Sequence, residues 1–299
     1  LFHLEGDDPY DKFLPKISSV ISKIVIIYLI LTIILFGLYY VNGMSLFDAV
    51  AHSFTTISTG GFSTHDLSFA YFESHSILLI AIIFMILGSF PFLVLAKTNI
   101  KNPFAAFKDH QVKIFLLLLF ISICLIYFFA QKYLIGSEIQ KIIIISFNTI
   151  SIISGTGFIS ENFEGWGNYA STLFLILMFI GGCAGSTTGG IKIFRLQILL
   201  KYIAIHLKKM LQPHAVIASH FNGRKIQDST YESVMIFFFI YILTFAFSAL
   251  LLSFSGLDFL TCFSAAASAI SNVGPGLGEI IGPEGNYGSL TSYTKIVLI

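Results

Sequence analysis

Five long, uncharged apolar runs constrain this chain more than any other feature. They lie at residues 24–42, 76–96, 114–130, 170–191 and 233–257, and a further run begins near Leu290. A helix needs about 20 mostly apolar residues to cross a bilayer. Charged residues make up only 11% of the chain, against about 25% in soluble domains. The sequence therefore predicts an all-α polytopic membrane protein.

Three shorter apolar segments lie between these runs, near residues 46–58, 139–154 and 258–271. At 1.5 Å per residue each reaches only about 20 Å, which is enough to enter a membrane halfway but not to cross it. Of the 17 basic residues, 14 precede the first run or join one span–dip–span unit to the next. Because basic loops stay on the cytoplasmic side, we expect the short segments to enter the membrane from outside as half-helices.

A polar motif recurs at the end of each half-helix. The stretches "TTISTGGF" (55–62), "SIISGTGF" (151–158) and "SAISNVGP" (268–275) all read [ST]-x-I-S-x-x-G-[FP]. Their matched serines are Ser58, Ser154 and Ser271, and their matched glycines are Gly61, Gly157 and Gly274. The unit of span, half-helix, polar strand and span thus occurs three times.

This recurrence favours a cation pathway. Irregular backbone at membrane depth is tolerated only where it is buried in protein or lines a water-filled path. Glycine permits a positive φ, so that successive carbonyls can face one axis and replace the water shell of a cation. The partially negative C-terminal end of each half-helix also favours a cation. The alternative is a face of small residues that only packs helices together.

Hydroxyl side chains of the motif are expected to hold the strands from behind. They belong to Thr55, Ser58, Ser151, Ser154, Ser268 and Ser271.

The glycine-rich stretch "GGCAGSTTGGIK" (181–192) lacks the spacing of a phosphate-binding loop. One interpretation is a kink between two packed helices. The other is a loop that unwinds near the axis of the cation pathway, on the cytoplasmic side of the three polar strands, and obstructs the path as a gate. We refer to these strands below as the filter. The residues assigned to this gating loop are Gly181, Gly182, Gly185, Ser186, Thr187, Thr188, Gly189, Gly190 and Lys192. Lys192 and Arg195 would add an electrostatic barrier, bind a partner or lipid headgroup, or simply anchor the inner face.

The stretches "FDAVAHSFTTISTGGFST" (47–64), "GGCAGSTTGGIKIFR" (181–195) and "SNVGPGLG" (271–278) closely resemble the TrkH/KtrB family of bacterial potassium-uptake subunits. The resemblance implies four helix–pore half-helix–filter strand–helix units of the K⁺-channel type around a pseudo-fourfold pore. It implies a homodimer and a cytosolic nucleotide-binding regulatory ring of the TrkA/KtrA type. It places the K⁺ selectivity filter at Thr59, Gly60, Gly61, Gly155, Thr156, Gly157, Asn272, Val273 and Gly274.

The same resemblance divides the chain into parts. Residues 1–16 are a cytoplasmic lead-in, 17–100 the second repeat, 101–210 the third repeat with its loop at 181–190, 211–231 a cytoplasmic connection, and 232–299 a truncated fourth repeat. We expect the first repeat and the last inner helix to be missing, and the 299-residue segment alone to be inactive in K⁺ uptake. The lead-in and the long 196–231 connection favour a TrkH-type over a KtrB-type protein.

The predicted function is potassium uptake across the bacterial cytoplasmic membrane, with no enzymatic activity. K⁺ is the only expected metal ion, no cofactor is expected in this chain, and nucleotide is expected on the regulatory partner. A net charge of +1 gives no sign of nucleic-acid binding. The alternatives are a K⁺/Na⁺ transporter of the KtrB type, an intramembrane lipid-modifying enzyme, or a passive structural subunit.

Three histidines have open roles. His52, in the first half-helix, either tunes the outer pore or bonds a neighbouring carbonyl. His65 and His75 lie near Asp66 and Glu73 in an outer loop, where a metal site has no ligand spacing to support it.

Overall fold

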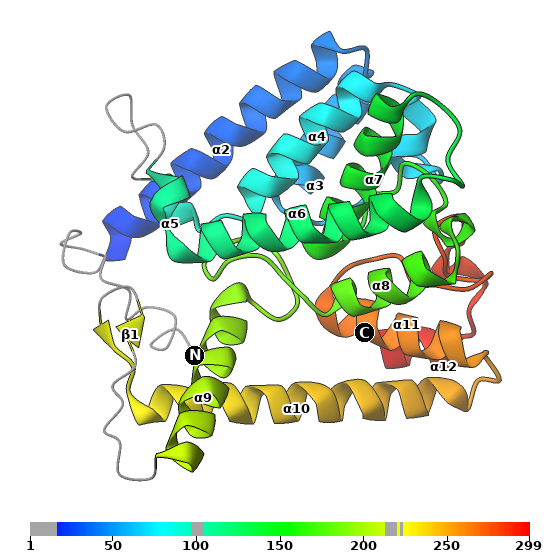
Figure 1. Ribbon diagram of the computed structural model, residues 1–299. Coiled ribbons are helices and arrows are strands. Elements are labelled where there is room, and N and C mark those ends of the chain that lie inside the picture. The colour runs from blue at the N-terminus through cyan, green and yellow to red at the C-terminus, as the bar shows by residue number, and fades with distance from the viewer. Residues whose placement is uncertain (1–16, 97–104, 213–219, 222–223) are drawn as a thin grey trace.

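The computed structural model describes residues 17–96, 105–212, 220–221 and 224–299, and it is almost entirely helical (Figure 1). The two short strands, β1 (His220–Phe221) and β2 (Arg224–Lys225), pair antiparallel. The helices are α2 (Ile17–Val41), α3 (Leu46–Ile57), α4 (His75–Gly88), α5 (Phe92–Leu95), α6 (His110–Ala130), α7 (Glu138–Ile153), α8 (Asn168–Met178), α9 (Ile193–Leu211), α10 (Asp228–Ser253), α11 (Phe259–Ser271) and α12 (Ser292–Leu298).

Three short helices, α3, α7 and α11, take the places predicted for the half-helices. Each packs between the helices before and after it in the chain: α3 between α2 and α4, α7 between α6 and α8, and α11 between α10 and α12. Further contacts join α4 to α7 and α8 to α11. The last helix of one unit therefore packs against the half-helix of the next. Successive units are in this way arranged around a common centre.

Side chains cap the N-terminal end of each half-helix. Ser45 Oγ accepts a hydrogen bond from the Asp48 N–H, and the Asp258 carboxylate accepts one from the Thr261 N–H. Ser137 forms a capping box with Gln140. Such caps satisfy amide groups that have no partner within the helix, so the local sequence itself sets where each half-helix begins.

Two predicted spans are interrupted in the structure. The run at 76–96 breaks after α4, because Pro91 has no N–H to continue the helix and starts the separate α5. The run at 170–191 is helical only as far as Met178. Among the described residues, three helices are long and apolar enough to cross a membrane: Val20–Val41, His110–Ala130 and Asp228–Ser253. The last begins inside the connection assigned to 211–231.

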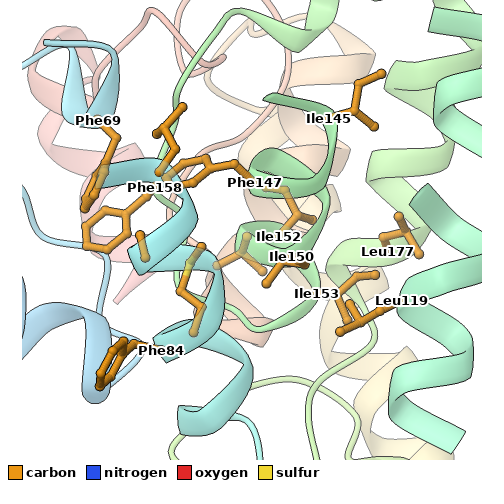
Figure 2. Close-up of a cluster of buried hydrophobic side chains, with 14 of the residues drawn as sticks. Phe69, Phe84, Leu119, Ile145, Phe147, Ile150, Ile152, Ile153, Phe158 and Leu177 are labelled. Atoms are coloured by element: carbon orange, nitrogen blue, oxygen red, sulfur yellow. The ribbon is translucent and has the colours of Figure 1, made fainter. Parts of the chain in front are cut away.

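The main core lies mostly among the helices and connecting segments of the first two units. Figure 2 shows Phe69, Phe147 and Phe158 turned toward one another within it. The ring centroid of Phe69 lies 4.4 Å from that of Phe158 and 5.2 Å from that of Phe147. All three side chains are at most 1% exposed. We call the polar segment that follows each half-helix and ends at its matched glycine a motif strand. Phe158 directly follows Gly157, so this core fixes the outer end of the second motif strand.

Candidate functional site

The backbone makes the same turn after each half-helix. The carbonyl oxygens of Thr55, Ser151 and Ser268 accept hydrogen bonds from the N–H groups of Gly60, Thr156 and Val273, over 2.8, 2.9 and 3.0 Å respectively. Each donor stands one residue before the matched glycine. The three-fold sequence motif therefore corresponds to a three-fold repeated backbone conformation.

Two residues of every motif strand have a positive φ. The matched glycines Gly61, Gly157 and Gly274 have φ values of 68°, 78° and 108°. The residues two positions earlier, Thr59, Gly155 and Asn272, have φ values of 51°, 67° and 55°. Alternation of left-handed residues with ordinary ones turns successive peptide groups to one side, as a carbonyl-lined path requires.

Thr59 is the costly member of this set. A β-branched residue in the left-handed region is a genuine conformational outlier, at a cost of about 1–2 kcal/mol. Its hydroxyl donates to the Ser58 carbonyl over 2.7 Å and lies 3.1 Å from Thr187 Oγ1. Strain of this kind persists where the surroundings over-determine the backbone, and such places are frequently functional.

The three strands lie against one another in sequence order. A Cβ on Gly61 would stand 1.6 Å from the Thr156 carbonyl oxygen, and one on Gly157 would stand 1.8 Å from the Val273 carbonyl oxygen. Thr156 and Val273 occupy the same motif position. Gly274 faces only the Gly157 Cα, at 3.9 Å, among the described residues. The close contact from a matched glycine to the next motif strand therefore occurs twice. Gly274 has no such strand against it among the described residues.

Three of the six hydroxyls predicted to support the strands do contact them. Ser151 Oγ donates to the Phe158 carbonyl over 2.7 Å. Ser154 Oγ lies 2.7 Å from Thr156 Oγ1, and Ser268 Oγ accepts the Gly274 N–H over 3.0 Å.

The other three have different partners. The hydroxyls of Thr55 and Ser58 bond carbonyls of their own half-helix turn. Ser271 Oγ lies 2.7 Å from the Tyr241 hydroxyl of α10. The motif pattern could not distinguish these cases, because the distinction depends on which helix packs behind each turn.

The glycine-rich loop forms a closed excursion between α8 and α9. Its neck is joined by hydrogen bonds from the Gly181 N–H to the Ile191 carbonyl over 2.9 Å, and from the Ile193 N–H to the Gly182 carbonyl over 3.0 Å. The approach of Gly181 to the Gly189 carbonyl oxygen leaves only 2.0 Å for a Cβ. The segment is thus an ordered loop closed by backbone hydrogen bonds, rather than a bend in one helix.

This loop passes beneath the C-terminal ends of all three half-helices. Thr187 Oγ1 lies 3.1 Å from the carbonyl oxygen of Ile57, the last residue of α3. A Cβ on Gly189 would stand 2.0 Å from the carbonyl oxygen of Ser271, the last residue of α11. Gly155, directly after the cap of α7, has the Gly189 nitrogen 3.4 Å from its own Cβ position. The residues assigned to the gating loop therefore reach the inner end of every motif strand.

Lys192 turns back into the loop. Its Nζ contacts the Thr188 carbonyl oxygen, lies 3.0 Å from Thr188 Oγ1 and lies 3.4 Å from the Ser186 carbonyl oxygen. The Arg195 guanidinium lies 4.0 Å above the ring centre of Phe237 on α10. The ammonium group is thus a cross-link within the loop, an outcome that its neighbours in sequence did not indicate.

Contacts between units also join the outer segments, and the sequence motifs did not reveal them. The Ile159 N–H donates to Ser68 Oγ over 3.2 Å, and the Ala70 N–H donates to the Ile159 carbonyl over 3.1 Å. In the next unit, the Gly278 N–H donates to Glu164 Oε1 over 2.5 Å. Ser68 and Glu164 each stand seven residues past a matched glycine, so a comparison at that offset would have drawn attention to them.

Two of the three histidines with open roles, His52 and His65, have structural partners. His52 Nδ1 lies 2.8 Å from the Asp48 carbonyl oxygen, the backbone contact expected of such a residue. His65 stacks on Tyr71 with ring centroids 3.5 Å apart. No group of three or more His, Cys, Asp or Glu residues in the described part of the chain has the arrangement of a metal site.

Comparison with known proteins places this geometry in a family. Residues 4–299 match the family described as TrkH, cation transport protein. The chain is 38% identical to the Trk system potassium uptake protein TrkI of Halomonas elongata, covering 100% of this chain and 61% of that protein. It is 32% identical to TrkH of Escherichia coli K12, covering 97% of this chain and 60% of that protein.

A solved structure has the same fold. The crystal structure of the potassium transporter TrkH from Vibrio parahaemolyticus superposes with a TM-score of 0.88 at 33% identity, covering 96% of this chain and 62% of that one. The chain thus spans about three fifths of the length of these relatives. With a family match over nearly its whole length and the same helical architecture, this chain belongs to the TrkH family of cation transport proteins.

Proposed function

We propose that this chain forms most of a potassium-uptake pathway across the bacterial cytoplasmic membrane. The observation that carries the proposal is the recurrence of paired left-handed residues on three strands that approach one another in order. The names of the relatives, which are potassium uptake proteins, support K⁺ as the transported ion. A fourth strand on the open side of Gly274 would complete the ring.

The polarity of the site favours a cation. The N–H groups of Gly60, Thr156 and Val273 are already bonded to their own half-helices, so they are not available to an anion. The C-terminal ends of the half-helices point their negative dipole ends at the same place. The filter then consists of residues 59–61, 155–157 and 272–274, whose carbonyls replace the hydration shell of K⁺.

The loop at 181–190 acts as the gate in this proposal. It lies beneath the filter strands and contacts the ends of α3 and α11, where it obstructs an ion leaving the filter toward the cytoplasm. An irregular loop at this depth needs burial or a water path to be stable. Lys192 stiffens the loop through its contacts to Ser186 and Thr188.

The working assembly in this proposal is a homodimer with a cytosolic nucleotide-binding ring of the TrkA/KtrA type. The names of the relatives, which assign them to the Trk system, support a multi-component transporter. Any nucleotide acts on the ring, and this chain carries no cofactor of its own. A KtrB-type transporter of K⁺ and Na⁺ is the second candidate.

The intramembrane enzyme considered from the sequence is not supported, because the family is one of cation transport proteins. The passive structural subunit leaves the repeated strands without a role.

Potassium flux tests the proposal. The full-length protein reconstituted with its regulatory partner should take up tracer K⁺ into liposomes and rescue cells that lack K⁺ uptake. Uptake of Na⁺ at the same rate would favour the KtrB-type alternative. Liposomes that contain folded protein and partner but show no cation flux would refute the transport function.

A further inference from the structure

In all three units a buried polar side chain in the middle of the half-helix bonds the chain just beyond the matched glycine. We call these contacts the outer tethers. They are the pairs His52–Ser63, Asn148–Ser160 and Ser264–Leu277. The half-helix member of each pair is 0% exposed, so each is a buried polar group that must be satisfied inside the protein.

In the first of these pairs, the imidazole of His52 joins two segments. Its Nδ1 lies 2.8 Å from the Asp48 carbonyl oxygen and its Nε2 lies 2.9 Å from Ser63 Oγ. Because a carbonyl can only accept, Nδ1 carries the proton and Nε2 accepts the Ser63 hydroxyl. The ring is held edge-on by Phe69 and Phe72, each with its ring centroid 5.2 Å from the imidazole.

The second pair uses an amide in place of the imidazole. Asn148 Nδ2 donates to the Ile144 carbonyl over 3.0 Å and to Ser160 Oγ over 2.8 Å. Asn148 Oδ1 accepts the Ser160 N–H over 3.2 Å. As in the first pair, one contact goes to the carbonyl four residues back in the half-helix and the others go to the outgoing chain.

The third pair uses a hydroxyl and reaches the backbone directly. Ser264 Oγ accepts the Leu277 N–H over 2.8 Å and lies 3.1 Å from the Leu277 carbonyl oxygen. Thr261 Oγ1, one turn earlier in α11, lies 3.4 Å from the same carbonyl oxygen.

The tethers are equivalent in position although their chemistry differs. His52 and Asn148 stand nine residues before the matched glycine and Ser264 stands ten before it. Their partners stand two or three residues after it. The turn carbonyls hold the inner end of each strand, and the tethers hold the outer end, so the filter lies between two fixed points.

We propose that His52, Asn148 and Ser264 are positioning residues that set the ion selectivity of the filter. The inference rests on the proposed function, since it assigns a role within that pathway. Carbonyls on a short irregular strand keep their spacing only if both ends are restrained. Loss of a tether removes one restraint on the outer end and lets the carbonyls close around a smaller cation.

The experiment compares the K⁺/Na⁺ tracer-flux ratio of full-length variants in liposomes. His52→Ala and Asn148→Ala remove a tether. Ser53→Ala and Thr149→Val are matched controls, since these neighbouring buried hydroxyls bond carbonyls of their own helix, those of Val50 and Ile145. His52→Ala loses one hydrogen bond to the outgoing chain and should lower the ratio about fivefold. Asn148→Ala loses two and should lower it at least as much, while the controls keep it.

Rescue and a second pair of variants keep the inference testable. His52→Asn, which introduces the side chain used in the neighbouring unit, should recover most of the ratio. If the alanine variants do not fold, Ser63→Ala removes the contact of His52 from the strand side. Ser160→Ala removes the side-chain contact of Asn148 and leaves the hydrogen bond from the Ser160 N–H, so its effect should be the smaller. An unchanged ratio, or reduced flux with an unchanged ratio, overturns the inference. If the wild-type protein carries no K⁺, the proposed function fails and the inference fails with it.

Discussion

Replacement of Gly157 by alanine is the sharpest test of the proposed filter geometry. A Cβ at this position would lie 1.8 Å from the Val273 carbonyl oxygen, and real Cβ atoms do not come within 3.0 Å of such a neighbour. The two strands must therefore separate by at least 1.2 Å, the difference between these distances. The obstructing atom is backbone, so no side-chain rotation relieves the contact.

The backbone conformation of Gly157 adds an energetic cost to this steric conflict. Gly157 has a φ of 78°, and an L-residue in the left-handed region pays about 1–2 kcal/mol. Because the displaced oxygen belongs to the neighbouring motif strand, the change alters two strands of the proposed filter at once. We expect the K⁺/Na⁺ flux ratio to fall at least about tenfold, equivalent to roughly 1.4 kcal/mol of lost discrimination.

Two control glycines separate this effect from loss of glycine in general. Gly165 and Gly37 have open space at the Cβ position and no left-handed φ. Gly165→Ala and Gly37→Ala should leave the flux ratio at the wild-type value. Tracer flux of the full-length protein in liposomes, with folded protein verified by size-exclusion chromatography, measures all three variants. If Gly157→Ala folds and keeps the wild-type ratio and K⁺ affinity, the argument for this strand is wrong.

Four further changes test the proposed gate, the core and a helix cap. Deletion of residues 185–189 should raise K⁺ flux and reduce its dependence on the regulatory partner, with the ion ratio little altered; wild-type flux and partner dependence in a folded variant would reduce the loop to a packing element. Thr187→Val removes a hydroxyl 3.1 Å from the Ile57 carbonyl oxygen and should raise basal flux several-fold, because loss of this hydrogen bond weakens the contact between the loop and α3. Lower flux would contradict a role of this contact in keeping the proposed gate closed. Phe158→Ala should destabilise the protein by about 3–5 kcal/mol, seen as a lower unfolding temperature in detergent, and a shift of under 1 °C would exclude its core role. The hydrogen bond from Thr261 lowers the pKa of the Asp258 carboxyl. The ionised cap therefore stabilises α11 at neutral pH, and this stabilisation weakens as the pH falls below about 4. Asp258→Ala should lower the unfolding temperature at pH 7 but have less effect at pH 3.

Local sequence determined the elements of this fold. Apolar runs without charge predicted helices for the bilayer. Capping residues such as Ser45 and Ser137, seen in the structure, show that local sequence also sets where the half-helices begin. The shared spacing from motif serine to motif glycine predicted three equivalent polar strands. In the structure each begins with a turn that a hydrogen bond closes within a few residues. Hydropathy alone was insufficient at Pro91, where an apolar run contains a residue that breaks the helix.

Tertiary structure decided which of these parts meet. The approach of Gly61 to Thr156 and of Gly157 to Val273 joins segments about 95 to 116 residues apart, and no local pattern carries that information. The inward turn of Lys192 and the outer tether from His52 to Ser63 depend likewise on how the chain returns after each half-helix. Short-range hydrogen bonds and hydropathy depend on residues that are neighbours in the sequence, whereas the strands align around one centre only when the helices behind them pack.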